Sequence, residues 1–152
     1  MVTKCSLPSS SRLHEYANPS DFLDCYAISS DHKLDHAAQI LMAFPSWVRG
    51  LMWMRNMLVR PLGLNTEPVE NEHNIGIFPV ESESLDEIVA GFDDRHLNFR
   101  ISVLKHCNKI HLATWVHPHN LLGHIYLAGV MPFHIVIVRN ALHRLSKSPV
   151  IQ

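Results

Sequence analysis

Apolar side chains recur at helical spacing in two adjacent stretches near the N-terminus. The first stretch follows a capping Ser30 or Asp31 and stops before Pro45, which cannot continue a helix. Its apolar positions lie three or four residues apart and are Leu34, Ala37, Ala38, Leu41 and Met42. The second stretch begins near Ser46 and runs toward Pro61. The pattern therefore predicts a short pair of helices.

Outside these helices the apolar period shortens to two, which is typical of strands. Four such segments, separated by short polar joints, cover residues 75–84, 86–92, 96–106 and 109–117. A further segment, residues 21–28, precedes the helices. Strands that follow one another with the helices kept apart favour an antiparallel sheet in an α+β protein.

Asp93 and Asp94 are suited to the turn of a hairpin between two of these strands. With a two-residue loop, the apolar face of the hairpin holds the opposed pairs Ala90–Leu97 and Ile88–Phe99. The other face then places Glu87 opposite Arg100, as an ion pair at the surface.

A last helix follows Asn120, whose side chain is a suitable N-cap. It is apolar on all sides from Leu121 to Val138, and we expect Pro132 to kink or restart it. This stretch is about as long as the shortest membrane spans, but His124, His134 and Pro132 make a lipid-facing helix unfavourable. We therefore expect a core helix that is buried by the sheet on most of its faces.

Together these elements predict an α+β fold, with a curved antiparallel sheet around a long C-terminal helix and a short helical pair near the N-terminus. We expect residues 1–20 to form a polar tail or a lead-in strand, and residues 21–152 to form a single domain.

Three blocks of the sequence resemble a known family. They are "PSWVRGLMWMRNMLVRPLGL", "GFDDRHLNFRISV" and "WVHPHNLLGHIYLAGVMPFHIVIVRNAL". The chain, from about Asp21 to Leu145, is similar in these blocks to the family of domains of unknown function numbered 2867. That family is similar to the START-like (Bet v 1-like) helix-grip superfamily, in which a curved sheet grips a C-terminal helix over a cavity. The resemblance implies a fold and a cavity; it transfers no activity and no catalytic residue.

Composition narrows the function classes. Lys and Arg number 13 against 14 Asp and Glu, so the chain carries no charge footprint for nucleic acid. The cysteines, Cys5, Cys25 and Cys107, have no metal-type or CxxC spacing, which indicates reduced thiols and a cytoplasmic protein. The N-terminus lacks the apolar centre of a signal peptide. Phosphate-binding, dinucleotide-binding and HExxH motifs are also absent, so we expect no cofactor and no metal.

Arg55 is the first candidate for a site, because it lies within the apolar stripe of the second helix. Its charge requires an anionic or carbonyl partner if it is buried. Three alternatives stay open for the Arg55 guanidinium: it reaches water, it pairs with a structural carboxylate, or it faces a ligand. Met52 on the same helix, Tyr126 and His134 on the last helix, and Trp115 on a strand complete the set of ligand-binding candidates.

Three weaker candidates lie on the strands and their turns. Glu87 is a partner for Arg100 or, less directly, for Arg55. His96 follows the Asp93–Asp94 turn, where neighbouring side chains point in different directions. His117 and His119 are two positions apart at a strand end and therefore share one face, although no third metal ligand is identifiable.

Three hypotheses follow. The first is a protein that binds a hydrophobic small molecule in an interior cavity. The second is a small acid–base enzyme of the cyclase, isomerase or dehydratase type that uses His134, Tyr126 and Arg55 around the same cavity. The third is a membrane-surface or partner-binding module that uses the helix carrying Trp47, Trp53, Arg49 and Arg60.

Overall fold

The computed structural model describes residues 1–62 and 73–151, with the side chains of Leu51, Met52, Met54, Arg55, Leu58, Val59 and Leu62 also outside the description. The strands are β1 (Thr3–Lys4), β2 (Phe22–Ser29), β3 (Asn74–Ile75), β4 (Phe78–Glu83), β5 (Glu87–Asp93), β6 (Leu97–His106) and β7 (Lys109–Pro118). The helices are η1 (Arg12–Glu15), α1 (Leu34–Met42), α2 (Ser46–Val59), η2 (Arg60–Leu62) and α3 (Leu121–Lys147).

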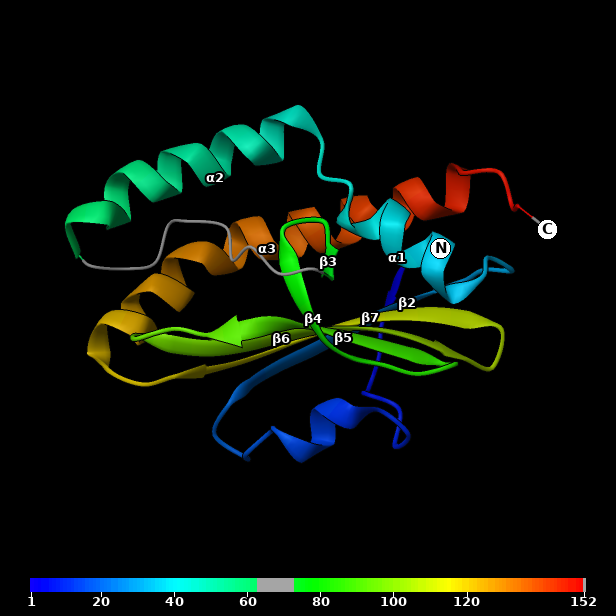
Figure 1. Ribbon diagram of the computed structural model, residues 1–152, viewed down its shortest axis with the longest axis horizontal. Coiled ribbons are helices and arrows are strands. Elements are labelled where there is room, and N and C mark those ends of the chain that lie inside the picture. Colours follow the sequence, from blue (N-terminus) through cyan, green and yellow to red (C-terminus); the bar gives the residue numbers. More distant parts are fainter. Residues whose placement is uncertain (63–72, 152) are drawn as a thin grey trace.

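The strands form one antiparallel sheet in the order β1-β2-β7-β6-β5-β4-β3. Strands β4 to β7 follow one another as hairpins. Strand β2, which is distant in the sequence, pairs with β7, with Phe22 opposite Val116. Helices α1, α2 and α3 lie on one side of the sheet, and η1 lies on the other (Figure 1). The predicted α+β class, the antiparallel sheet and the long C-terminal helix are confirmed.

The helix side of the sheet holds the larger hydrophobic core. All five apolar positions predicted for the first helix are buried in it, between the sheet and the second half of α3. The predicted N-cap is wrong, because α1 begins after Lys33 and Ser30 instead bonds the ring of His32 through its hydroxyl. The predicted second helix is confirmed as α2.

The opposite side of the sheet is covered by the N-terminal segment, residues 5–17. Leu13 of η1 is fully buried against Val89, Ala113 and Trp115. Ser11 is the N-cap of η1, and its hydroxyl accepts a hydrogen bond from the Leu13 N–H. Both faces of the central strands are therefore covered, which explains why β5 and β7 are buried along most of their length.

The hairpin between β5 and β6 has a different register from the predicted one. Asp93 lies opposite Asn98 and Ala90 opposite Ile101, so the loop is longer than two residues. The slip is an even number of residues, so Ile88 still faces the helix-side core, as predicted. Glu87, however, lies opposite Leu104 and Arg100 opposite Gly91, which rules out the predicted Glu87–Arg100 pair.

Apart from Gly123, the buried residues of α3 lie toward its C-terminal end, which contradicts the expectation of a helix buried on most of its faces. Leu142 and Leu145 are fully buried, whereas Leu121 is 74% exposed and Ile125 60% exposed. Asn120 caps the helix as predicted, with its side chain accepting from the Gly123 N–H, and the helix continues through Pro132. Among the described residues α3 is also the one helix long and apolar enough to cross a membrane. Its last turns nevertheless belong to the core of the sheet.

Candidate functional site

The sequence-predicted candidates divide between the two faces of the sheet. Tyr126 and His134 lie on α3, on the helix side. Trp115, His117 and Glu87 lie on the other face, because they alternate with the residues that contact the helices. The side chains of Arg55 and Met52 lie outside the described residues, although both residues belong to α2. The predicted candidates therefore do not form one site.

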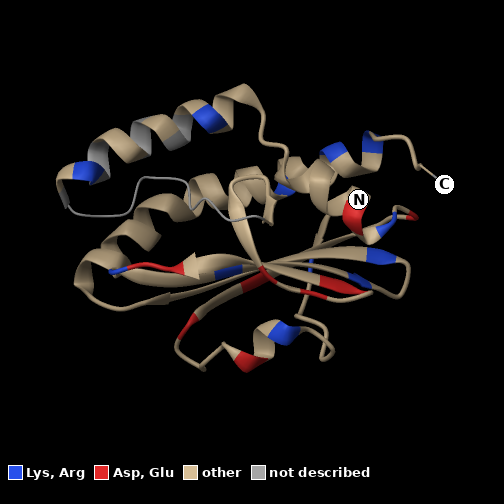
Figure 2. Ribbon diagram, viewed as in Figure 1, with Lys and Arg blue, Asp and Glu red and all other residues tan. Residues whose placement is uncertain are grey.

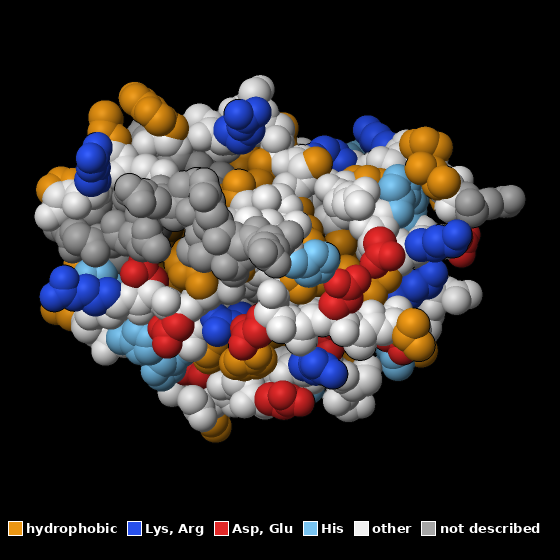
Figure 3. Space-filling view, in the orientation of Figure 1, with side chains coloured by type: hydrophobic (Ala, Val, Ile, Leu, Met, Phe, Trp, Pro, Cys, Tyr) orange, Lys and Arg blue, Asp and Glu red, His pale blue; other side chains and the backbone are white. Residues whose placement is uncertain are grey.

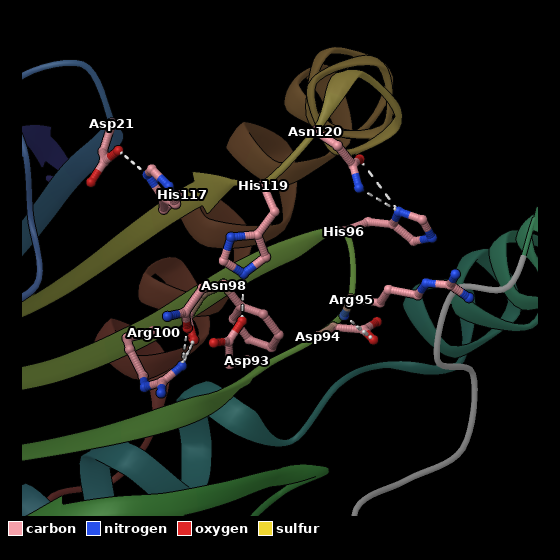
Figure 4. A network of polar contacts seen from close by, with 11 residues as sticks. Asp21, Asp93, Asp94, Arg95, His96, Asn98, Arg100, His117, His119 and Asn120 are labelled. Carbon is pink, nitrogen blue, oxygen red and sulfur yellow. Dashed lines mark hydrogen bonds and ion pairs between the residues drawn. The ribbon is translucent and has the colours of Figure 1, made fainter.

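A network of polar side chains occupies one end of the sheet (Figure 4). The Asp21 carboxylate has only 2% of its side chain exposed and lies 2.5 Å from Nδ1 of His117. It also accepts hydrogen bonds from the Trp115 indole N–H at 3.0 Å and from the Asn18 backbone N–H at 2.9 Å. Burial would raise the pKa of Asp21, but these three hydrogen bonds, led by the one with His117, hold its pKa below the usual value. Asp21 is therefore an anion that orients a partly exposed imidazole.

A second histidine–carboxylate pair lies beside the first. Nε2 of His119 is 2.6 Å from the Asp93 carboxylate, and both side chains are partly exposed. The rings of His117 and His119 have their centroids 5.5 Å apart, so the two histidines share one face, as predicted. In each ring one nitrogen contacts a carboxylate. The other nitrogen is therefore the one suited to ligand binding or proton exchange at the surface.

His96 has a positional role at the same end of the sheet. Its Nδ1 lies 2.9 Å from the Asn120 amide nitrogen, and its carbonyl accepts from the His119 N–H. Gly123 packs directly against the His96 backbone: a Cβ at position 123 would lie 2.1 Å from the His96 carbonyl oxygen. Asp94 accepts from the Arg95 N–H within the turn itself. His96 thus fastens the β5–β6 turn to the start of α3.

Glu87 is an internal anchor of the N-terminal segment. Its carboxylate is 3% exposed and accepts from the Ser11 hydroxyl at 2.6 Å, the Ser102 hydroxyl at 2.5 Å and the Arg12 N–H at 2.8 Å. Arg100 instead forms its ion pair with Glu81, and its guanidinium lies 5.4 Å from the centre of the Tyr16 ring. Sequence reasoning missed Ser11 and Ser102, because neither the last residue of a serine run near the N-terminus nor a single serine within a strand carries a signal of its own.

On the helix side, a buried acid–histidine pair lies between β2 and α3. Nε2 of His134 is 3.0 Å from Oδ2 of Asp24, and the ring meets Phe22 edge-on at 5.9 Å. The Asp24 side chain is 4% exposed, and its Oδ1 has no hydrogen-bond partner among the described residues. Such an unpaired oxygen is costly unless a group outside the described residues contacts it. Asp24 was missed by the sequence reasoning, although a carboxylate in an otherwise apolar strand was visible there.

Much of the α3 helix exposes apolar side chains. The exposed positions from Leu121 to Val136 follow one helical stripe, and the same stripe continues into Arg139, His143 and Lys147. Helix α2 is similar, with Trp53 67% and Met57 56% exposed, and Figure 3 shows hydrophobic side chains projecting from it. We give the exposed apolar residues of the two helices one name, the α2–α3 surface; they are Trp47, Trp53, Met57, Leu121, Ile125, Phe133 and Val136.

A pocket of about 430 Å³ opens between α1 and the β3–β4 hairpin. Met42, Ile75 and Ile88 form its apolar part, and Asp35 and Glu83 its acidic part. None of the predicted candidates with a described side chain lines it. Its size suits a small molecule, but the polar pairs described above lie elsewhere.

The fold belongs to the α+β class, with an antiparallel sheet that packs against a long C-terminal helix. A family model, described as protein of unknown function (DUF2867), matches residues 16–141, and the chain belongs to this family. No curated protein matches the chain. No solved structure matches it either.

Proposed function

We propose that the protein binds the surface of anionic membranes through the α2–α3 surface. The observation that carries the proposal is an exposed apolar stripe on α3 that becomes cationic toward its C-terminal end. Monomeric proteins rarely expose contiguous apolar side chains without a partner for them. Tryptophan and long apolar side chains next to arginines are the composition of helices that lie in the membrane interface.

The distribution of charge supports a bilayer with anionic headgroups as the partner. The segments α2, η2 and α3 contain five arginines and one lysine but no acidic residue, so all 14 Asp and Glu lie elsewhere in the chain. Figure 2 shows this separation, with the acidic residues on the sheet and around η1 and α1. Three glutamates, Glu67, Glu70 and Glu72, fall in the part of the chain that the structure does not describe. Attraction between this surface and anionic lipid should weaken as salt screens it.

Vesicle flotation tests the proposal. The protein should float with vesicles that contain phosphatidylserine at low salt, and much less with phosphatidylcholine alone or at ~0.5 M salt, where the Debye length falls to a few ångströms. Phe133→Ser and Trp53→Ser should reduce flotation, because each removes an exposed apolar side chain from the surface. Leu85→Ser is the matched control, since Leu85 is 95% exposed but lies in the β4–β5 turn.

The contribution of the arginines to membrane binding is tested separately, with a control of its own. Arg49→Glu and Arg60→Glu should each weaken flotation, whereas Lys109→Glu, an exposed lysine at the start of β7, should leave it unchanged. The absence of flotation at low salt would end the proposal. An equal loss in the Leu85 and Lys109 controls would show that the attraction is not located at the α2–α3 surface.

A hydrophobic small molecule bound between the sheet and α3 is the second candidate function, as the resemblance to START-like helix-grip proteins implies. The specific observation in its favour is the buried Asp24–His134 pair with an unpaired carboxylate oxygen, among the described residues, beside the less buried part of α3. That pair would bind the polar end of an otherwise apolar molecule. Native mass spectrometry of gently purified protein should then detect a bound small molecule. Asp24→Asn should reduce its occupancy, and Asp31→Asn, at an exposed position, should not.

A further inference from the structure

Three metal-ligating side chains from separate parts of the chain meet on the face of the sheet that is covered by the N-terminal segment. They are Cys5, which follows β1, Cys25 in β2 and His111 in β7. The Cys5 N–H donates to the Cys25 carbonyl at 2.9 Å, which fixes the first cysteine beside the second. In the β2–β7 ladder Cys25 lies opposite Ala113 and His111 opposite Ala27, so both side chains project from the same face.

The distances between the three ligand atoms match those of an occupied metal site. The two sulfur atoms are 3.5 Å apart, and Nδ1 of His111 lies 3.7 Å from the Cys5 sulfur and 3.9 Å from the Cys25 sulfur. A tetrahedral Zn²⁺ with ordinary bond lengths holds two sulfurs ~3.8 Å apart and a sulfur and a nitrogen ~3.6 Å apart. An ion therefore fits between these atoms with only small side-chain movements.

The second observation is the setting of His111. The residue is only 7% exposed, and its Nδ1 faces the two thiols. On its other side the ring lies near the backbone of His106, although Nε2 makes no hydrogen bond of ordinary geometry among the described residues. Thiols are weak hydrogen-bond partners for Nδ1, whereas sulfur and imidazole together are ligands that Zn²⁺ prefers.

We propose that Cys5, Cys25 and His111 form a binding site for a thiophilic divalent cation, represented by Zn²⁺. Two thiols release their protons to solvent as they bind, and two thiolates with one neutral imidazole give a site of zero net charge around Zn²⁺. A neutral site is compatible with burial. Water completes the fourth position. The ion would join the N-terminal segment to β2 and β7, on the opposite side of the sheet from the α2–α3 surface.

Protons compete with a metal ion for this site. Burial and the hydrogen bond with Cys5 raise the pKa of the Cys25 thiol far above its usual value, so an ion must displace a firmly held proton in order to bind there. Burial lowers the pKa of His111, which keeps the imidazole neutral and its lone pair available.

Zinc titration of the intact protein tests the site. The wild-type chain is reduced with a phosphine, stripped with a chelator and titrated with Zn²⁺ in competition with a chromophoric indicator. One ion should bind per chain with a Kd below about 1 μM. Co²⁺ in its place should give the visible bands of a tetrahedral ion and a sulfur-to-metal charge-transfer band.

Variants locate the site. Cys5→Ser and His111→Gln should each weaken Zn²⁺ binding by ~100-fold or more, since even outer contacts to metal ligands are worth 10–100-fold. Cys107→Ser is the matched control, because Cys107 is exposed in the β6–β7 turn and should leave binding unchanged. If a variant fails to fold, the Co²⁺ spectrum of the wild-type protein still decides whether sulfur ligates the ion.

Two results would overturn the proposal. One is the failure of the reduced wild-type protein to bind Zn²⁺ or Co²⁺; if the protein before reduction contains a Cys5–Cys25 disulfide, the sulfur pair is then a structural cross-link. The other is binding that survives in both ligand variants. Neither result bears on membrane binding, which involves the other side of the sheet.

Discussion

On its helix side the sheet is stabilised by apolar contacts with α1 and the second half of α3, whereas on its other side the apolar contacts of Leu13 are joined by hydrogen bonds to buried carboxylates. Leu142 and Leu145 represent the apolar contacts of the helix side, and Glu87 and Asp21 are the buried carboxylates of the other side. Apolar contact scales with buried area and tolerates small shifts, but a hydrogen bond to a buried carboxylate depends on direction and charge. The two faces should therefore respond differently to substitution and to pH.

The largest effect is expected on the helix side. Leu142→Ala removes a fully buried side chain from the core and should lower the free energy of unfolding by about 2–5 kcal/mol. Leu121→Ala, on the same helix but 74% exposed, should change it by no more than about 0.5 kcal/mol. Urea unfolding followed by circular dichroism measures both. Similar losses in the two variants would contradict the division of α3 into a packed and an exposed part.

Two glycines of α3 should give effects of opposite sign. Gly123→Ala would place a Cβ 2.1 Å from the His96 carbonyl oxygen, and the overpacking should cost about 1–3 kcal/mol. A Cβ on Gly129 would meet no atom of another described segment within 4 Å, so Gly129→Ala should stabilise the protein by up to about 1 kcal/mol through helix propensity. Thermal unfolding of the pair gives the signs directly. A destabilising Gly129→Ala would mean that this part of α3 is covered.

On the other face, Glu87→Gln should cost about 1–2 kcal/mol, because the amide keeps one acceptor oxygen but turns an N–H₂ toward a hydroxyl or N–H donor. Amide hydrogen exchange should rise in residues 11–16 and stay unchanged in α3. Glu83→Gln serves as the control, since the Glu83 side chain is 45% exposed and its pair with His73 is worth little. Faster exchange in α3 as well would show that the two faces are not independent.

The smallest effect is a pH dependence that belongs to the N-terminal side. The folded-state pKa of Asp21 lies below its unfolded value, so its contribution to stability is complete above pH ~3.9 and is lost as the pH falls through the folded pKa. The difference in the free energy of unfolding between wild type and Asp21→Asn should therefore be largest near neutral pH and shrink toward pH ~3. A difference that stays constant over this range would refute the assignment of the depressed pKa to Asp21.

The elements of the fold were predictable because each has a local pattern. Helical spacing identified α1 and α2, and alternation identified the strands from β4 to β7. The β5–β6 register was not predictable, because Asp93 and Asp94 suit a turn equally well whether the loop consists of these two residues, as predicted, or of residues 94–97, as the Asp93–Asn98 pair requires. The exposure of the first part of α3 was also missed. A helix that is apolar on all sides is expected to be buried, but its sequence does not show which other segment covers it.

The polar sites depended on pairings between distant parts of the chain. His134 was recognised as a polar residue on an apolar face, but its partner Asp24 is separated from it by 110 residues. Cys5, Cys25 and His111 have no motif spacing, because the β2–β7 pairing brings them together rather than a loop or helix. Such a cluster becomes visible only when the strand order is known.

The strand order has a consequence for how copies of the protein meet. Both outer strands of the sheet, β1 and β3, are only two residues long. A strand that short offers few free backbone groups for a second chain to extend the sheet. Self-association by strand addition is thereby disfavoured, and a crowded solution of this protein should instead associate, if at all, through its helices.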